Sequence, residues 1–560
     1  MNSIKINRST VGKDALAGLT AAIAAIPDGM ATAILAGVNP VYGLYNLMVG
    51  TPVAALFTSS VYMAVINTSA MALVVFEALS GYSGEEQVKA LVTLTLLVGV
   101  FMLLLGLLKL GFLTRFISNS VMRGFLTGIA FVIILSQLSD FTGYAAEGAN
   151  KITQTIDLLL NLNQVDPYTV IVGTLTILLI IVLDRTRLNA ISMLVALVVG
   201  ALLVVILDWS TVALVGDAFQ IPRELPRPML PDLTLIPQLL FSAVAIGIIG
   251  LVQASGVSQG YPNPDGNYPT PDGDFKGQGL GNMVASFFQG IPMGGSVSGT
   301  ALVVGAGART RWANIFTGIF VAISVLLFAN QIEKLPMSCL AAILIYAGAM
   351  SIKPVEIRKV WNTNTLSAAI FTLTLFATLV LPVQQAIFLG VIIQILLYIF
   401  QAAERMAVMQ LVLTPEGDFR EEIAPTKLTS NQVTILVPRG SLFFAAARDF
   451  EEEVPSTDEA HNAVVIIDLR GRLQVGSTFM GVLERYSQAL QANGGKLFLV
   501  NVSEPIYRQL QKTGTLQVLG SDSILHTSGL YLGSLQSALT TAQKWLSDKG
   551  DQEAPTDLSG

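Results

Sequence analysis

Long runs of apolar residues, separated by short polar loops, dominate the chain up to about Glu404. Runs such as ALVTLTLLVGVFMLLLGLL and LSAAIFTLTLFATLVL approach or exceed the roughly 18 to 20 apolar residues that a helix needs to cross a bilayer. The pattern predicts an α-helical polytopic membrane protein with about fourteen segments, arranged as two halves of about seven. Several segments are too short or too rich in glycine to cross the membrane completely.

The pattern changes near Glu404, where charged residues become frequent. The segments VTILVPRG, AVVIIDLRG and KLFLVNV predict strands, and STFMGVLERYSQALQAN predicts an amphipathic helix. Alternating strands and helices predict a small α/β domain. We therefore expect four parts: an N-terminus (1–13), a membrane domain (14–407), an α/β domain (408–547) and a disordered tail (548–560).

The composition agrees with a membrane protein and excludes several other classes. The 560 residues are 52% hydrophobic and only 12% charged, whereas about 25% of a soluble protein is charged. The net charge of −6 gives no indication of nucleic-acid binding, and the single cysteine, Cys339, excludes an internal disulfide. Both histidines lie in the C-terminal domain, and no nucleophile–base pair or metal-ligand cluster stands out. We therefore expect neither an enzyme nor a metal site.

The loop charges predict the orientation in the membrane. With an even number of segments both termini lie on one side, and the loops of that side hold most of the lysine and arginine, which indicates that it is cytoplasmic. The inside loops hold Lys109, Arg115, Arg123, Arg185, Arg187, Lys276, Arg309, Arg311, Lys353, Arg358, Lys359 and Arg405, and the outside loops hold Lys89, Lys151, Arg223, Arg227 and Lys334. The first apolar run lacks a signal-peptide cleavage pattern, so we expect it to be retained as a span.

Two short stretches far apart in the chain are almost alike: NTSAMALVV (67–75) and SVSGTALVV (296–304). Each places hydroxyl groups and very small residues before Ala-Leu-Val-Val. Interrupted segments at corresponding positions of two halves indicate the binding site of a secondary transporter. A chance similarity is the alternative.

A short helix that begins inside the membrane offers N–H groups without partners and about half a positive charge at its N-terminus. Two such helices make an anion site without any lysine or arginine. Ser69 and Ser298 are the predicted helix starts, and Gly299 lets a ligand approach the backbone. Further donors are Asn67, Thr68, Ser296 and Thr300. Alternatively, these small residues only allow helices to pack closely.

Asp28 follows Pro27 in the middle of the first span, where a carboxylate is costly and indicates a function by default. Pro27 and Gly29 predict a break in the helix, so that Asp28 faces a cavity and carries a proton or holds a sodium ion; the alternative is a surface position. Two helix dipoles supply roughly one positive charge. This balance favours a monovalent anion, or a dianion that moves together with a cation.

These residues carry a resemblance to a known family. IPDGMATAILAGVNPVYGLY resembles the SulP signature, usually Ile-Pro-Gln-Gly-Met-Ala-Tyr-Ala, and GQGLGNMVASFFQGIPMGGSVSGTALVVGAGARTRWANIFTG resembles the ninth to eleventh spans of that family. The C-terminal part resembles a STAS domain. Over residues 10 to 545 the chain resembles a SulP, or solute-carrier-26, anion transporter. The resemblance implies a seven-plus-seven inverted repeat with core and gate domains, elevator-type motion, homodimers and cytoplasmic STAS domains.

The resemblance also implies the site residues. The anion site falls on Ser69 and Ala70 in the third span and on Ser298, Gly299 and Thr300 in the tenth. Many members have arginine at the position of Gly299, and sodium-dependent members have aspartate where this chain has Gln253. Some proton-coupled members have a first-span carboxylate at the position of Asp28, which favours a proton over sodium as the coupling ion. No other cofactor is expected.

Two further features have open interpretations. Asp265, Asp272 and Asp274 lie in one loop, where a cation site is conceivable but Asp-Gly turns are the favoured explanation. Ser477 matches a serine that is phosphorylated in some STAS relatives, and the favoured alternative is a helix cap. We expect a coupled transporter of an inorganic anion, bicarbonate or sulfate, in the cell membrane. The alternatives are an uncoupled chloride channel or exchanger, and an anion sensor that signals through a cytoplasmic partner of the STAS domain.

Overall fold

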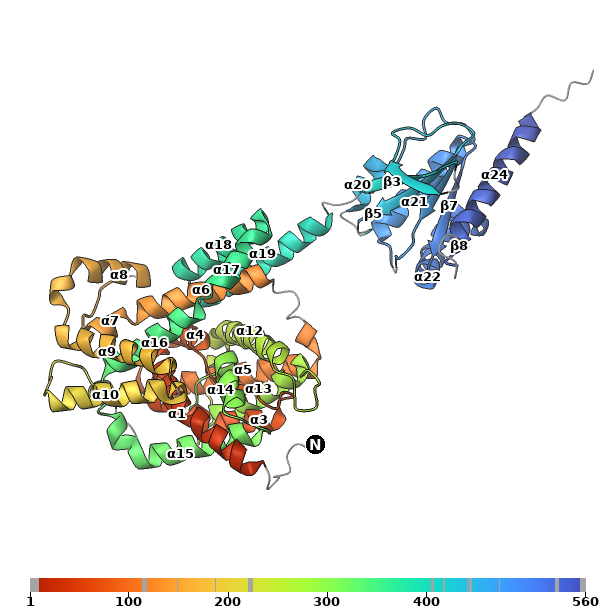
Figure 1. Ribbon diagram of the computed structural model, residues 1–560. Helices are drawn as coiled ribbons and strands as arrows, with labels where there is room; N and C mark the ends of the chain where they lie inside the picture. Colours follow the sequence, from red (N-terminus) through yellow and green to blue (C-terminus); the bar gives the residue numbers. More distant parts are fainter. Residues whose placement is uncertain are drawn as a thin grey trace, which may run out of the picture. The chain divides into compact units, whose positions relative to one another are not determined.

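The computed structural model describes residues 10–112, 118–148, 150–186, 188–219, 225–403, 407–415, 418–440, 442, 446–472, 474–528 and 533–553. The chain forms two compact units, Met1–Ile395 and Leu396–Gly560 (Figure 1). Residues 1–9 of the predicted N-terminus, residues 554–560 of the predicted tail, and Arg115, Arg187, Arg223 and Arg405 lie outside the described residues.

The first unit consists of helices and one small sheet (Figure 1). Its helices are α1 (Val11–Leu35), α2 (Pro40–Tyr45), α3 (Thr51–Phe57), α4 (Ser69–Leu79), α5 (Gly84–Leu107), α6 (Asn119–Ser136), α7 (Leu138–Thr142), α8 (Lys151–Leu160), α9 (Pro167–Asp184), α10 (Ser192–Ile206), α11 (Val215–Ala218), α12 (Ile236–Gly260), α13 (Pro271–Ser286), α14 (Val297–Gly305), α15 (Trp312–Ile332), α16 (Met337–Ser351), α17 (Pro354–Thr363), α18 (Thr365–Val380) and α19 (Val383–Ala403). A π-helical turn, Asn46–Gly50, joins α2 to α3, and short 3-10 turns cover Leu162–Gln164, Asn189–Ile191 and Leu233–Leu235. The two strands are β1 (Ala64–Asn67) and β2 (Met293–Ser296).

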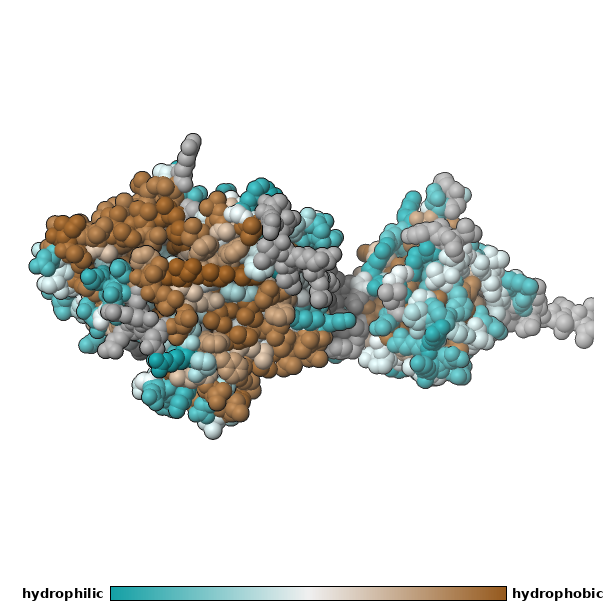
Figure 2. Space-filling view, turned by 90° about the horizontal axis from the view of Figure 1, so that it is seen from below, coloured by the Kyte–Doolittle hydropathy of each residue, from teal (hydrophilic) through white to brown (hydrophobic). Residues whose placement is uncertain are grey.

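Several of these helices are suited to a membrane. Among the described residues, six helical segments are long and apolar enough to cross one: Val11–Leu35, Gly84–Leu107, Asn119–Thr142, Pro167–Asp184, Leu233–Gly260 and Met337–Thr363. Figure 2 shows hydrophobic residues over much of the surface of this unit, and leucine and valine of α9 and α10, such as Val182, Leu202 and Val205, are exposed there. An apolar surface of this kind faces lipid.

Helices of the two halves pack in a reciprocal pattern. Helix α1 contacts α15, and α5 contacts α12; in the same way α3 contacts α15, and α13 contacts α5. Among the later helices, α6 contacts α18 and α16 contacts α9. In each of these three pairs of contacts, the second contact repeats the first with the helices of the two halves exchanged. An inverted repeat produces packing of this kind.

Helices α5 and α13 approach closely through glycines. A Cβ atom at Gly99 would lie 2.6 Å from the backbone nitrogen of Met283, and one at Gly279 would lie 2.6 Å from that of Leu103. Small residues allow such backbone contact between membrane helices. This contact fixes α13, which holds part of the site described below.

Helix α1 is continuous through Pro27, so the predicted break at Pro27 and Gly29 is wrong. The carbonyls of the two residues after the proline accept side-chain hydrogen bonds. The Thr32 hydroxyl donates to the carbonyls of Asp28 (2.9 Å) and Gly29 (3.0 Å). The Asn67 amide also donates to the Gly29 carbonyl, at 3.4 Å.

The second unit is an α/β domain with a six-stranded sheet in the order β4-β3-β5-β6-β7-β8. Strands β5 to β8 are parallel, and β3 pairs antiparallel with both β4 and β5. The strands are β3 (Ala407–Leu413), β4 (Phe419–Ile423), β5 (Val433–Arg439), β6 (Val464–Asp468), β7 (Lys496–Val502) and β8 (Ile524–His526), and the helices are α20 (Ala446–Glu453), α21 (Ser477–Ala492), α22 (Glu504–Thr513), α23 (Thr515–Leu519) and α24 (Gly533–Glu553). The three strands and the helix predicted from the sequence are confirmed as β5, β6, β7 and α21.

Both faces of this sheet are covered. Every residue of β6 is buried, as expected for a central parallel strand. Val465 and Ile467 pack in the cluster that contains Phe479 of α21, whereas Val464 and Ile466 pack against Ala538 and Ala542 of α24. Since α24 continues to Glu553, the predicted start of a disordered tail at residue 548 is too early.

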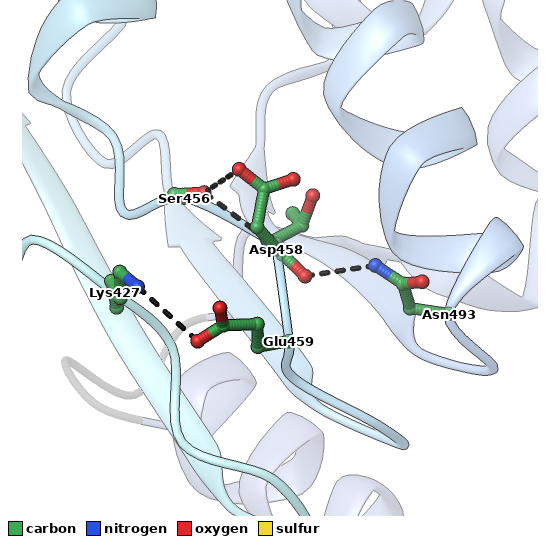
Figure 3. A network of polar contacts seen from close by, with 6 residues as sticks. Lys427, Ser456, Asp458, Glu459 and Asn493 are labelled. Carbon is green, nitrogen blue, oxygen red and sulfur yellow. Dashed lines mark hydrogen bonds and ion pairs between the residues drawn. The ribbon is translucent and has the colours of Figure 1, made fainter.

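A polar network closes the end of the sheet at which β6 and β7 begin (Figure 3). Lys427 forms an ion pair with Glu459 at 3.2 Å, and the Ser456 hydroxyl donates to Asp458 at 2.8 Å. Asn493, which follows α21, donates to the Thr457 carbonyl at 2.8 Å. The network holds the loop before β6 in place.

Candidate functional site

The two similar stretches of sequence meet in the structure. Strand β1 directly precedes α4, strand β2 directly precedes α14, and the strands pair antiparallel, with Ala64 opposite Ser296 and Asn67 opposite Met293. The sheet is buried along its whole length. The N-termini of α4 and α14 therefore emerge from opposite ends of one small sheet, about 10 Å apart for a rise of roughly 3.3 Å per residue. The sequence did not predict these strands.

Side chains of α13 satisfy the backbone of β2. Asn282 donates to the Met293 carbonyl (2.9 Å) and accepts from the Met293 N–H (2.8 Å), as a neighbouring strand would. Gln278 accepts from the Gly295 N–H at 3.0 Å. Non-helical backbone is tolerated at membrane depth only when its polar groups are satisfied in this way. The sequence signal was available: two amides one helical turn apart in the apolar segment GQGLGNMVASF.

Hydroxyl and amide groups hold β1 in the same manner. The Thr51 hydroxyl donates to the Val65 carbonyl at 2.7 Å, and Asn314 of α15 donates to the Met63 carbonyl at 3.1 Å. The Ala64 N–H donates to the hydroxyl of Thr300 at 3.0 Å. The last bond connects β1 directly to the first turn of α14.

Helix α4 begins at Ser69, as predicted. Its N-cap residue, Thr68, does not cap it, because the Thr68 hydroxyl donates to Gln253 of α12 at 3.2 Å. The first N–H groups of the helix, including those of Ser69 and Ala70, have no acceptor within the helix. Gln253 therefore lies beside the start of α4, where the resemblance placed a coupling-ion site.

Helix α14 begins at Val297, one residue before the predicted start. Ser296 is its N-cap, and the Ser296 hydroxyl accepts from the Gly299 N–H at 3.1 Å and lies 3.2 Å from the Ser298 hydroxyl. An anion must displace this cap to reach the Gly299 N–H, which corrects the expectation of a free donor there. The Ser298 side chain is exposed, so its hydroxyl is accessible to a ligand.

Two of the predicted donors are used within the protein. Asn67 is 2% exposed; it donates to the Gly43 carbonyl (2.9 Å) and accepts from Asn46 (2.5 Å). Thr300 is fully buried, and its hydroxyl donates to the Ser296 carbonyl at 2.6 Å. In this conformation neither side chain is free to bind an anion. Both instead fix the strands from which the half-helices start.

Asp28 lies in α1, which contacts α4, α14 and β1. Its side chain is only partly buried, and in the described part of the chain its carboxylate forms no hydrogen bond. The next residue, Gly29, contacts the Asn67 amide through its carbonyl. Asp28 thus lies on the helix that contacts both half-helices.

Comparison with known proteins agrees with this arrangement. Residues 12–374 match the sulfate permease family, and residues 424–528 match the STAS domain. The chain belongs to the sulfate permease family. Its relatives include the "Probable sulfate transporter 4.2" of Arabidopsis thaliana, 30% identical over 392 residues, which cover 68% of this chain and 57% of the plant protein. The chain thus spans little more than half the length of that relative.

Solved structures of transporters show the same fold. The structure titled "The overall structure of SLC26A9" has a TM-score of 0.84 at 20% identity and covers 98% of this chain and 92% of its own. "The transmembrane domain of a cyanobacterium bicarbonate transporter BicA" has a TM-score of 0.58 at 23% identity and covers 70% of this chain and 98% of its own. This member of the sulfate permease family is therefore a multi-pass membrane protein that carries a STAS domain.

The acidic loop residues of this family member have structural partners. Asp265 accepts from the backbone and side chain of Asn267, both at 3.1 Å, in a turn as expected. Asp272 and Asp274 belong to the first turn of α13 instead. Asp272 accepts from the Gly111 N–H (2.7 Å), and Asp274 accepts from the Ser258 hydroxyl (2.6 Å). Among the described residues, no three His, Cys, Asp or Glu side chains are grouped for a metal.

Ser477 is the first residue of α21 in the STAS domain and is exposed. Gly476 occupies the N-cap position, so the expectation that Ser477 caps the helix is wrong. At the carboxyl end of β6, Asp468 accepts from Asn501 at 2.7 Å and from the Arg470 N–H at 2.8 Å. An exposed serine at a helix N-terminus is a position where a phosphate group is favoured electrostatically.

Proposed function

We propose that this member of the sulfate permease family is a secondary active transporter of a small inorganic anion, with bicarbonate and sulfate as the leading candidates. The observation that supports the proposal most is the pairing of β1 with β2, since it presents the N-termini of α4 and α14 from one buried sheet. The anion is bound by the N–H groups of Ser69 and Ala70 and by the Ser298 hydroxyl. Gly299 joins them when the Ser296 cap is displaced.

The charge at this site limits the substrate. Position 299 is glycine, so no fixed cation supplements the dipoles of α4 and α14. The two dipoles together supply roughly one positive charge. A monovalent anion is balanced by this charge, whereas a dianion needs a proton or another cation that moves with it.

Asp28 is the proposed coupling residue. Its carboxylate lacks a hydrogen-bond partner in the described part of the chain, and α1 contacts both half-helices. Protonation removes a negative charge beside the anion, so a proton and an anion bind together more easily than either alone. Sodium is less favoured because Gln253, at the position of the family's aspartate, accepts a bond from Thr68.

The remaining expectations follow from the family. We expect the substrate helices to move as an elevator between the two membrane faces, in a homodimer of the cell membrane with both termini cytoplasmic. The STAS domain then lies in the cytoplasm, where Ser477 is accessible to a kinase or to a partner protein.

Uptake of labelled bicarbonate and labelled sulfate into proteoliposomes tests the proposal, with an imposed pH gradient and an imposed sodium gradient in parallel. Saturable uptake of one anion, driven by the pH gradient, is the expected result. Unit conductance without coupling would indicate a channel instead. Binding without any flux would indicate a sensor that acts through the STAS domain.

A further inference from the structure

A second polar cavity lies away from the sheet, beside the far end of α4. It has a volume of about 190 Å³ and lies between α1 and α4 on one side and α6, α7 and α8 on the other. A water molecule needs roughly 10 to 15 Å³ of such volume, so the cavity accepts a small anion together with several waters. The residues important here are Phe76, Gln137, Asp140 and Lys151, all of which line it.

Lys151 supplies the positive charge of this cavity. Its ammonium lies 5.4 Å from the centre of the Phe76 ring and forms no hydrogen bond or ion pair within the described residues. Burial lowers the pKa of the Lys151 ammonium group. The negative charge of Asp140, which also lines the cavity, acts in the opposite direction and raises this pKa. An anion in the cavity would therefore give the partly desolvated Lys151 ammonium group the hydrogen-bond acceptor that it lacks.

The backbone fixes the position of Lys151 at the start of α8, although a positive charge there does not stabilise this helix. Asn150 and Thr153 form a capping box, with bonds of 2.9 Å and 3.0 Å, and this box places Lys151 at the first position of α8. A cation in the first turn of a helix opposes the helix dipole. The stability of α8 therefore does not account for a lysine at this position.

The cavity is connected to the proposed anion site through α4. Phe76 lies two turns after Ser69 on the same helix, about 10 Å along its axis at 1.5 Å per residue. In the proposed topology, Lys151 belongs to an outside loop. In that topology the cavity lies at the outer end of α4, between α4 and the helices α6 to α8.

We propose that this cavity is a second, weaker anion site, in which Lys151 holds the anion before it reaches the N-termini of α4 and α14. The inference rests on the proposed transport function. Asp140 lowers the affinity of the cavity, because it competes with the anion for the ammonium. Release toward the main site is then not slowed by tight binding.

A cysteine at position 151 tests the proposal, because the charge there can be set chemically. The only native cysteine, Cys339, is buried, so an added thiol is the single accessible one. Whole cells that express Lys151→Cys are treated with a positively or a negatively charged methanethiosulfonate reagent. Uptake of labelled bicarbonate and labelled sulfate is then measured. The matched control is Lys89→Cys, an exposed position of α5 that does not line the cavity.

The expected result is a KM about tenfold higher for Lys151→Cys, since a charged cleft concentrates its ligand by at least this factor. The positive reagent restores the KM and the negative reagent raises it further, whereas Lys89→Cys responds to neither. Equal inhibition by both reagents indicates steric blockage and overturns the proposal, as does an unchanged KM. Uptake of neither anion by the wild-type protein would contradict the proposed function itself.

Asp140→Asn provides a second test that does not depend on labelling. Removal of the competing carboxylate should lower the KM, and a higher KM with a normal unfolding temperature would overturn the proposal. If Lys151 only stabilises the C-terminus of α4, Lys151→Cys lowers the unfolding temperature and leaves the KM unchanged.

Discussion

Replacement of Thr300 by valine tests whether the anion site depends on the connection between β1 and α14. The Thr300 hydroxyl donates to the Ser296 carbonyl at 2.6 Å and accepts from the Ala64 N–H at 3.0 Å. Valine has nearly the same shape but can make neither bond. The N–H of Ala64, a residue that is 2% exposed, then has no acceptor.

An unsatisfied buried donor costs about 1 to 3 kcal/mol. We expect this cost to destabilise the arrangement that presents both helix starts, because the Ala64–Thr300 bond joins β1 to α14 there. The apparent affinity for the anion then falls by a factor of roughly 5 to 150. A fall in the free energy of unfolding of the same size accompanies it.

The control is Thr374→Val in α18. Thr374 is also 2% exposed, but its hydroxyl donates to the Ile370 carbonyl of its own helix at 2.8 Å, so the substitution removes a hydroxyl without leaving an N–H unsatisfied. The concentration dependence of anion uptake into proteoliposomes gives the KM, and thermal unfolding gives the stability. Equal KM values for the two variants would refute the proposed role of the β1–α14 connection.

Three further substitutions address the other parts of the site. Asp28→Asn should abolish uptake driven by a pH gradient while anion exchange at equal pH persists; gradient-driven uptake at the wild-type rate would exclude Asp28 as the proton carrier. Gly299→Arg should shift selectivity from bicarbonate toward sulfate. The control Gly299→Ala adds the same Cβ without charge and should not shift it. Identical selectivity of both variants would count against a site that depends on helix dipoles alone. Asn67→Asp should lower the free energy of unfolding by about 3 kcal/mol, because a carboxylate would face the Gly43 carbonyl that the amide now satisfies; an unchanged unfolding temperature would contradict this assignment.

The sequence predicted the half-helices more accurately than their surroundings. Small polar residues before an apolar run identify a helix start locally, and Ser69 is that start. Pairing between β1 and β2 joins residues more than two hundred positions apart, as in Ala64 with Ser296, and four-residue strands have no periodicity to detect. Pro27 predicted a break because its missing N–H is visible in the sequence, whereas α1 stays helical through it, as membrane helices tolerate a proline.

The roles of individual donors depended on the same distant contacts. Asn67 and Thr300 have the chemistry of anion ligands, but the Asn67 amide donates to the Gly43 carbonyl and the Thr300 hydroxyl donates to the Ser296 carbonyl. The Ser298 side chain, in contrast to those of Asn67 and Thr300, is exposed. Residue type therefore gave the set of possible donors, and packing decided which of them remain accessible to an anion.

The glycine at position 299 connects the packing of the site to the charge of its substrate. A Cβ atom there would lie 2.9 Å from Cδ1 of Ile66 and 3.2 Å from the Cβ of Ala64, so β1 packs directly against the first turn of α14. A larger residue at this position must therefore push aside the end of the Ile66 side chain. Position 299 itself carries no charge, so the site relies on helix dipoles of about one charge in total. A dianion can be carried under these conditions only if protonation of a group such as Asp28 restores the balance, so the substrate charge and the coupling ion are determined together.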